Sequence, residues 1–179
     1  MTGSRRLSQR ISEGDGIAII VHVGDAAAAR AAEEQGAKAL AVEGPVEGIR
    51  EATSLPVLWL GRGAPADADA LAFRPDGNGD HGELELVAEV RNEEELARVL
   101  DQLDPEIFLL APVAGDDEAN PLEPVLELLP DVPAGKLAIA AVDVATREEV
   151  EELERAGFDA VLVSAGHVGA LVGFEPPEV

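Results

Sequence analysis

Residues 146–169 read TREEVEELERAGFDAVLVSAGHVG. The first part is an acidic amphipathic pattern that begins at Thr146, a good N-cap residue, and stops at Gly157, which predicts a helix. The part after Gly157 is a short apolar run that ends in small residues, which predicts a strand. A helix that leads directly into a buried strand is the repeating unit of an α/β protein.

The same unit occurs earlier, at residues 25–42, where Gly36 separates a helix from a strand. Apolar runs of strand length recur along the whole chain, and most are continuous rather than alternating, as expected of parallel strands covered on both faces. The eight predicted strands are Gly16–Val23, Ala37–Val42, Pro56–Leu60, Ala68–Phe73, Glu83–Val90, Glu106–Val113, Lys136–Val142 and Ala160–Val163. The predicted helices between them are Ala26–Gln35, Val46–Ala52, Glu93–Leu103, Pro121–Leu129 and Arg147–Ala156, with Asn92 as a further N-cap.

Eight strand–helix units predict a minimal (β/α)₈ barrel, since 179 residues are fewer than the ~250 typical of that fold. The links after the third and fourth strands are too short for full helices, so those two helices are expected to be missing or very short. The whole chain, 1–179, is expected to form one domain, with an N-terminal helix or extension at 1–15 and a loose tail at 174–179. An open doubly wound sheet is the alternative, but the turn after the first strand has one glycine, Gly24, instead of a glycine-rich phosphate motif.

The composition narrows the range of partners. Thirty-six acidic and thirteen basic residues give a formal charge of −23, which disfavours nucleic acid and anionic membrane surfaces. The chain has no cysteine, which excludes disulfides and thiolate sites, and no apolar run long enough to span a membrane. We therefore expect a cytoplasmic protein without cofactors, either a monomer or a homodimer, whose partner is a small-molecule or anionic metabolite.

Several segments, taken in order, resemble the indole-3-glycerol phosphate synthase family, a tryptophan-pathway lyase with a phosphate-binding (β/α)₈ barrel. These segments are QGAKALAV (35–42), SLPVLWLG (54–61), DADALAF (67–73), LVAEVRNEEEL (86–96) and LAIAAVDVATREEVEELERAGFDAVLVSAG (137–166). The resemblance covers most of the chain and implies a barrel whose chemistry lies at the carboxyl ends of the strands.

Few of the family's catalytic groups are retained. The lysine of the third strand corresponds to Leu60, and the glutamate and lysine of the first strand to His22 and Gly24. The asparagine–arginine stretch of the sixth strand corresponds to Ala111, Pro112 and Val113, and the glutamate, serine and glycine of the seventh to Ala141, Val142 and Asp143. Only Glu89, on the fifth strand, keeps the family's residue type. Since the loss of one general acid costs about 10²–10⁴-fold in rate, efficient indoleglycerol phosphate synthesis is not expected.

The remaining candidate groups lie at predicted strand ends. His22 and Glu89 are the candidate catalytic pair, if the carboxylate orients the imidazole across the barrel, although a hydrogen-bonded polar filler is the favoured interpretation of His22. Ser164, Gly166, Asp143 and His167 are candidates for binding a ligand or phosphate after the last two strands, where the Asp143 carboxylate would oppose an anion. His22, Glu43, Glu89 and Asp143 are the only reasonable metal-ligand set, and no metal is predicted. Arg62, Arg74 and Arg91 are expected to neutralise acids near the mouth, and His81 to be a loop residue.

The sequence thus predicts a divergent, catalytically inactive relative of indole-3-glycerol phosphate synthase that retains weak binding of small molecules or anions. One alternative is an active lyase or isomerase that uses His22 and Glu89 on a small phosphorylated or carboxylated metabolite. Another is a non-catalytic interaction module that uses the surface left open by the missing helices.

Overall fold

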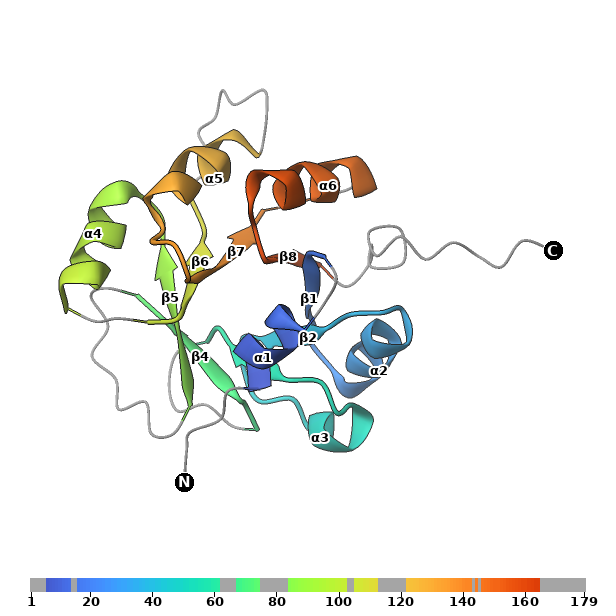
Figure 1. The fold of residues 1–179 in the computed structure, drawn as a ribbon. Coiled ribbons are helices and arrows are strands. Elements are labelled where there is room, and N and C mark those ends of the chain that lie inside the picture. The colour runs from blue at the N-terminus through green and yellow to red at the C-terminus, as the bar shows by residue number, and fades with distance from the viewer. Residues whose placement is uncertain are drawn as a thin grey trace.

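The chain folds into a closed barrel of eight parallel strands in sequence order, which confirms the predicted (β/α)₈ architecture (Figure 1). The computed structural model describes residues 6–13, 16–61, 67–74, 84–102, 105–112, 122–142, 144 and 146–164. The strands are β1 (Ala18–His22), β2 (Ala39–Val42), β3 (Val57–Trp59), β4 (Ala70–Phe73), β5 (Glu85–Val90), β6 (Ile107–Leu110), β7 (Leu137–Ala141) and β8 (Ala160–Ser164). β8 pairs with β1, so no strand edge is left open.

Five helices lie outside the barrel in Figure 1: α2 (Ala26–Glu34), α3 (Ile49–Ala52), α4 (Glu93–Gln102), α5 (Glu123–Leu128) and α6 (Arg147–Ala156). A 3₁₀ turn, Leu129–Asp131, follows α5. The predicted caps are confirmed: Glu95 N–H donates to Asn92 Oδ1 (2.8 Å) and Glu149 N–H to Thr146 Oγ1 (3.3 Å). Gly157 ends α6 in a left-handed conformation (φ 116°), which glycine adopts without strain.

One predicted helix is much shorter than expected, and the described parts of the two short links agree with the prediction. The helix expected at 46–52 is only α3, because Gly48 has a left-handed conformation (φ 76°) that interrupts the helix before Ile49. No helix occurs in the described parts of the links from β3 to β4 and from β4 to β5, whose residues 62–66 and 75–83 lie outside the description. The strands β1 to β7 are shorter than predicted, whereas β8 extends one residue further, to Ser164. Some residues past the strand ends still bond to the neighbouring strand, as Leu60 N–H does to the Val42 carbonyl, so the differences are of the size expected at element ends.

The helix α1 (Arg6–Ser12) covers the amino-terminal end of the barrel and lies in front of it in Figure 1. Its Leu7 and Ile11 are buried against the barrel interior, and the Ser8 N–H donates to Glu85 Oε1 (3.0 Å) from the first residue of β5. This end is therefore closed by side chains, and proteins of this fold bind their ligands at the opposite, carboxyl end.

Two apolar cores lie on the two faces of the barrel wall. The inner core is built from residues that alternate along the strands, such as Ile20, Leu58, Val87 and Ile139, and the outer core packs the wall against the helices. Alanines at many inner positions, including Ala39, Ala70 and Ala160, leave the barrel narrow enough to be filled without aromatic residues.

A short Asp–Ala sequence starts two of the strands in the same way. Asp69 Oδ2 accepts the N–H of Val57 (2.9 Å), and Asp159 Oδ2 accepts the N–H of Ala138 (2.9 Å). Each carboxylate thus ties the start of its own strand to the start of the preceding one. Asp69 also accepts from Arg50 Nη1 (3.0 Å) at the end of the barrel closed by α1.

No described helix is both long and apolar enough to cross a membrane.

Candidate functional site at the carboxyl end of the barrel

The strand registers define which side chains meet at the open end of the barrel. Side chains along each strand point alternately into the barrel and toward the helices. At the carboxyl ends of β1, β3, β5 and β7, the inward-facing residues are His22, Leu60, Glu89 and Ala141. Alternate strands of this fold contribute one layer of four side chains, so these four lie at the same height. We define the C-terminal mouth by seven inward residues at this end: His22, Leu60, Ala72, Arg74, Glu89, Ala141 and Leu162.

His22 and Glu89 lie on opposite sides of the mouth, because β1 and β5 are four strands apart in a ring of eight. A strand spacing of ~4.8 Å and a tilt of ~36° give a backbone diameter of about 15 Å. The two side chains therefore extend toward the barrel axis from opposite walls of the mouth.

His22 is the last residue of β1, and its register partners are Ala41 and Ser164. Its side chain is half buried. Within the described residues it makes no hydrogen bond or ion pair, so the predicted contact in which Glu89 orients the imidazole is not present.

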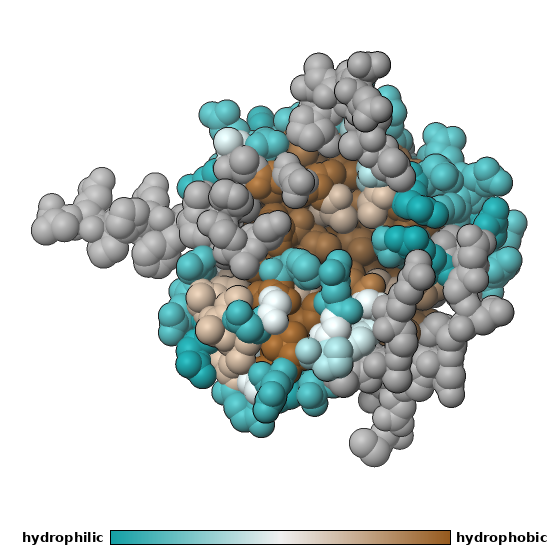
Figure 2. Space-filling view, turned by 180° about the vertical axis from the view of Figure 1, so that it is seen from behind, coloured by the Kyte–Doolittle hydropathy of each residue, from teal (hydrophilic) through white to brown (hydrophobic). Residues whose placement is uncertain are grey.

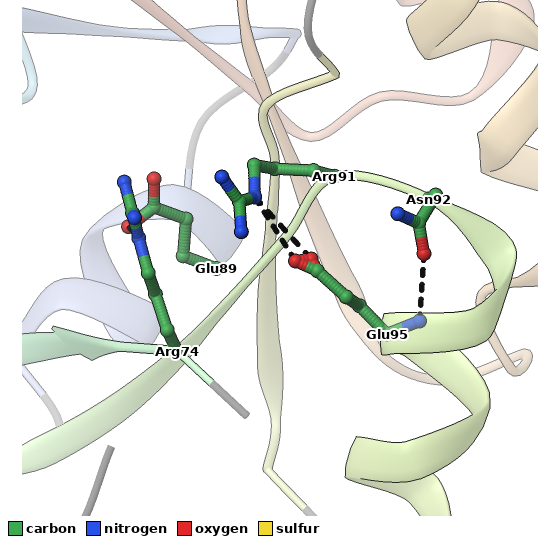
Figure 3. A network of polar contacts seen from close by, with 5 residues as sticks. All are labelled: Arg74, Glu89, Arg91, Asn92 and Glu95. Atoms are coloured by element: carbon green, nitrogen blue, oxygen red, sulfur yellow. Dashed lines mark hydrogen bonds and ion pairs between the residues drawn. The ribbon is translucent and has the colours of Figure 1, made fainter. Parts of the chain in front are cut away.

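Glu89 contacts Arg74 instead. The register pairs Phe73 of β4 with Ala88 of β5, so the next position along brings Arg74 beside Glu89. Arg74 Nε lies 3.5 Å from Glu89 Oε2, with the two side chains 50% and 20% exposed (Figure 3). The prediction that Arg74 neutralises an acid at the mouth is thus confirmed.

A second arginine stands at the rim, where Arg91 follows β5. Its Nε donates to Glu95 Oε1 (3.0 Å) and approaches Glu95 Oε2 (3.3 Å), and Asn92 caps the same turn of α4 (Figure 3). The spacing of four residues in the sequence signals this pair, which the sequence analysis missed. Arg91 is therefore held to the start of α4, whereas Arg74 stands at the inner wall. Arg62, the third predicted arginine, lies outside the described residues.

Positions where the synthase family has catalytic groups are apolar in the mouth. Leu60, Ala111 and Ala141 are all half buried, and none of them can transfer a proton. Ser164 ends β8 beside His22 in the register, but only its backbone is described. The other predicted ligand-binding residues, Asp143, Gly166 and His167, lie outside the described residues, as do Val113 and His81.

No group of three potential metal ligands gathers among the described residues. Glu43, one member of the set considered from the sequence, is exposed just after β2.

A separate groove of about 540 Å³ lies on the outer wall, between α6 and the start of β1. Ile17, Ile19 and Val150 form its apolar part, and Lys38 and Arg147 stand at its edge. Arg147 is paired there with Glu151 (3.3 Å). The sequence analysis did not predict this groove, because it is formed by elements far apart in the chain.

No protein-family model and no curated protein matches the sequence. Among solved structures, the chain is similar to the N-acetylmannosamine-6-phosphate 2-epimerase from Clostridium perfringens, with a TM-score of 0.67. The match covers 84% of this chain and 87% of that one, at 17% sequence identity. At that identity the similarity shows the fold alone, and the chain is a (β/α)₈ barrel. The similarity to an epimerase does not support the predicted relation of this chain to the indole-3-glycerol phosphate synthase family.

Proposed function

We propose that the protein is an isomerase-type enzyme that moves a proton on a small phosphorylated or carboxylated metabolite bound in the C-terminal mouth. The observation that supports this proposal most directly is the position of His22 and Glu89 in one layer, on opposite walls of the mouth. A carbon atom held between them would have one acid–base group on each face.

The reaction needs no oxidant or reductant. The Glu89 carboxylate removes a proton from the carbon next to a carbonyl group, and the electron pair of the broken C–H bond moves into that carbonyl to form an enolate. The His22 imidazolium then delivers a proton to the same carbon from the opposite side, and the enolate electron pair forms the new C–H bond as the carbonyl is restored. Glu89 then releases its proton to solvent and His22 takes one proton from solvent, which returns both side chains to their starting states.

Arg74 supports this assignment, because its contact with Glu89 Oε2 holds the carboxylate against the wall of the mouth. The position of a base affects the rate strongly, since misplacement of a reacting group by about 1 Å can cost on the order of 10²-fold in rate. The similarity in fold to a phosphosugar epimerase is in keeping with proton transfer at this end of a barrel.

The resemblance to indole-3-glycerol phosphate synthase supports the barrel fold but not the synthesis of indoleglycerol phosphate. Glu89 alone keeps the family's residue type, while Leu60 and Ala141 replace groups that the family uses. The chemistry we propose uses only groups that this chain has.

The proposal is tested by proton exchange in deuterated water. The protein is incubated with a panel of 2-hydroxy acids, 2-substituted 3-oxo acids and sugar phosphates, and deuterium uptake next to the carbonyl is followed by NMR. We expect at least one substrate class to exchange, and Glu89→Gln and His22→Asn each to slow exchange by about 10²–10⁴-fold. Glu127→Gln, on the exposed face of α5, is the matched control and should leave the rate unchanged. Exchange that survives both mouth substitutions would contradict the proposal.

A further inference from the structure

Most of the C-terminal mouth is apolar. In the layer that contains His22 and Glu89, the two remaining positions are Leu60 and Ala141, and both are half buried. The layer beneath adds Ala72 and Leu162, which also remain partly exposed. Viewed from this end, hydrophobic residues gather at the centre of the molecule, with hydrophilic residues around them (Figure 2). A molecule bound between His22 and Glu89 therefore rests on an apolar floor.

The floor is uneven because side chains of different size contribute to it. The layer beneath His22 consists of Ala41, Ala72, Leu109 and Leu162, one from each even-numbered strand. The two alanines belong to β2 and β4, on either side of Leu60, whereas the two leucines belong to β6 and β8. Ala41 and Leu109 are buried, so the mouth exposes Ala72 and Leu162 of this layer, and the smaller side chain, Ala72, forms the low part of the floor beside Leu60.

The charged side of the mouth adjoins this low part of the floor. Arg74 directly follows β4, the strand that carries Ala72, and half of its side chain is exposed. Its closest approach to Glu89 is through Nε, and a guanidinium has five N–H donors, more than one carboxylate accepts. Arg74 can therefore hold Glu89 and bind a second carboxylate through its terminal nitrogens at the same time.

We infer that the substrate is a small monocarboxylic acid with an unbranched or branched alkyl body, rather than a sugar phosphate. This inference rests on the proposed function. Its carboxylate binds Arg74, its reacting carbon lies between Glu89 and His22, and its alkyl part lies over Ala72 against Leu60. Sugar hydroxyls at the same place would lose water and face leucine and alanine side chains, which cannot replace those hydrogen bonds.

The test measures the affinity of the intact protein for butanoate, pentanoate and hexanoate by calorimetry, with glucose 6-phosphate as the comparison. Each added methylene should raise the affinity about fourfold, as expected for its complete burial. Ala72→Leu should remove the gain from the longer acids while leaving butanoate bound, because it fills the lowest part of the floor. Arg74→Gln should weaken all three acids by a similar factor, and Arg98→Gln, on α4, should change none of them.

Tighter binding of the sugar phosphate than of the acids would overturn the inference, as would affinity that does not depend on chain length. Ala72→Leu also guards against loss of folding, since retained butanoate binding shows an intact mouth. The two proposals fail separately. Chain-length-dependent binding without proton exchange would contradict the reaction but leave the ligand class standing, whereas exchange on sugar phosphates alone would contradict the ligand class.

Discussion

At the scale of single residues, Gly61 has the tightest steric requirement beside the mouth. A Cβ atom added at Gly61 would come within 1.9 Å of the carbonyl oxygen of Glu43, which belongs to the backbone after β2. We predict that Gly61→Ala pushes the ends of β2 and β3 apart and lowers the free energy of unfolding by about 1–3 kcal/mol, as for other overpacked sites.

The matched control for this substitution is Gly24→Ala, which also follows a barrel strand but has nothing within 4 Å of the added atom. Chemical denaturation of both variants gives the comparison. If Gly61→Ala is as stable as Gly24→Ala, the close approach of the two loops is not a feature of the protein in solution.

The polar groups of the site could be identified from the sequence only in part. His22 and Glu89 were predicted because each stands at the carboxyl end of an apolar run, where side chains of this fold meet a ligand. Their positions on opposite walls, and the contact of Glu89 with Arg74, depend on strand register and barrel closure. These arise from pairing between segments far apart in the chain, which local periodicity does not encode.

At the scale of the elements, the Asp–Ala starts of β4 and β8 connect neighbouring strands. The Asp69 side chain is 7% exposed, and it accepts both the Val57 N–H and Arg50 Nη1. We predict that Asp69→Ala destabilises the protein by about 1–3 kcal/mol, because a buried N–H and the Arg50 guanidinium lose their acceptor. Asp159→Ala should cost less, since Asp159 is more exposed and binds only the Ala138 N–H among the contacts described.

Thermal melts of the two aspartate variants and of Asp101→Ala, an exposed position on α4, give the ranking. A destabilisation of Asp69→Ala no larger than that of Asp101→Ala would show that the carboxylate does not hold the strands together. The elements themselves were predictable: α6 has the expected bounds, β1 to β7 lie within their predicted runs, and β8 extends one residue beyond its run. α3 is shorter than expected because the conformation of Gly48 is not visible in a hydrophobic pattern.

At the scale of the whole molecule, the net charge of −23 opposes the compact state through self-repulsion. We predict that the melting temperature rises by several degrees when NaCl is raised from about 0.1 M to about 1 M, since the Debye length falls from ~10 Å to ~3 Å. The rise caused by charge screening should level off at high NaCl concentration. Sucrose serves as the comparison, because stabilisation by an excluded solute continues to grow with concentration. A melting temperature that does not respond to NaCl would contradict the prediction that self-repulsion of the excess negative charge destabilises the folded state.

The central claim is that small carboxylic acids bind in the C-terminal mouth, and methyl NMR during a titration with hexanoate tests it most directly. We expect shifts of the Leu60, Ala72 and Leu162 methyl signals, and of the Arg74 Nε–H signal, to saturate together. The methyl groups of Ile17 and Val150, in the groove on the outer wall, should stay unchanged. Shifts confined to Ile17 and Val150, or a mouth that does not respond at saturating hexanoate, would contradict the account.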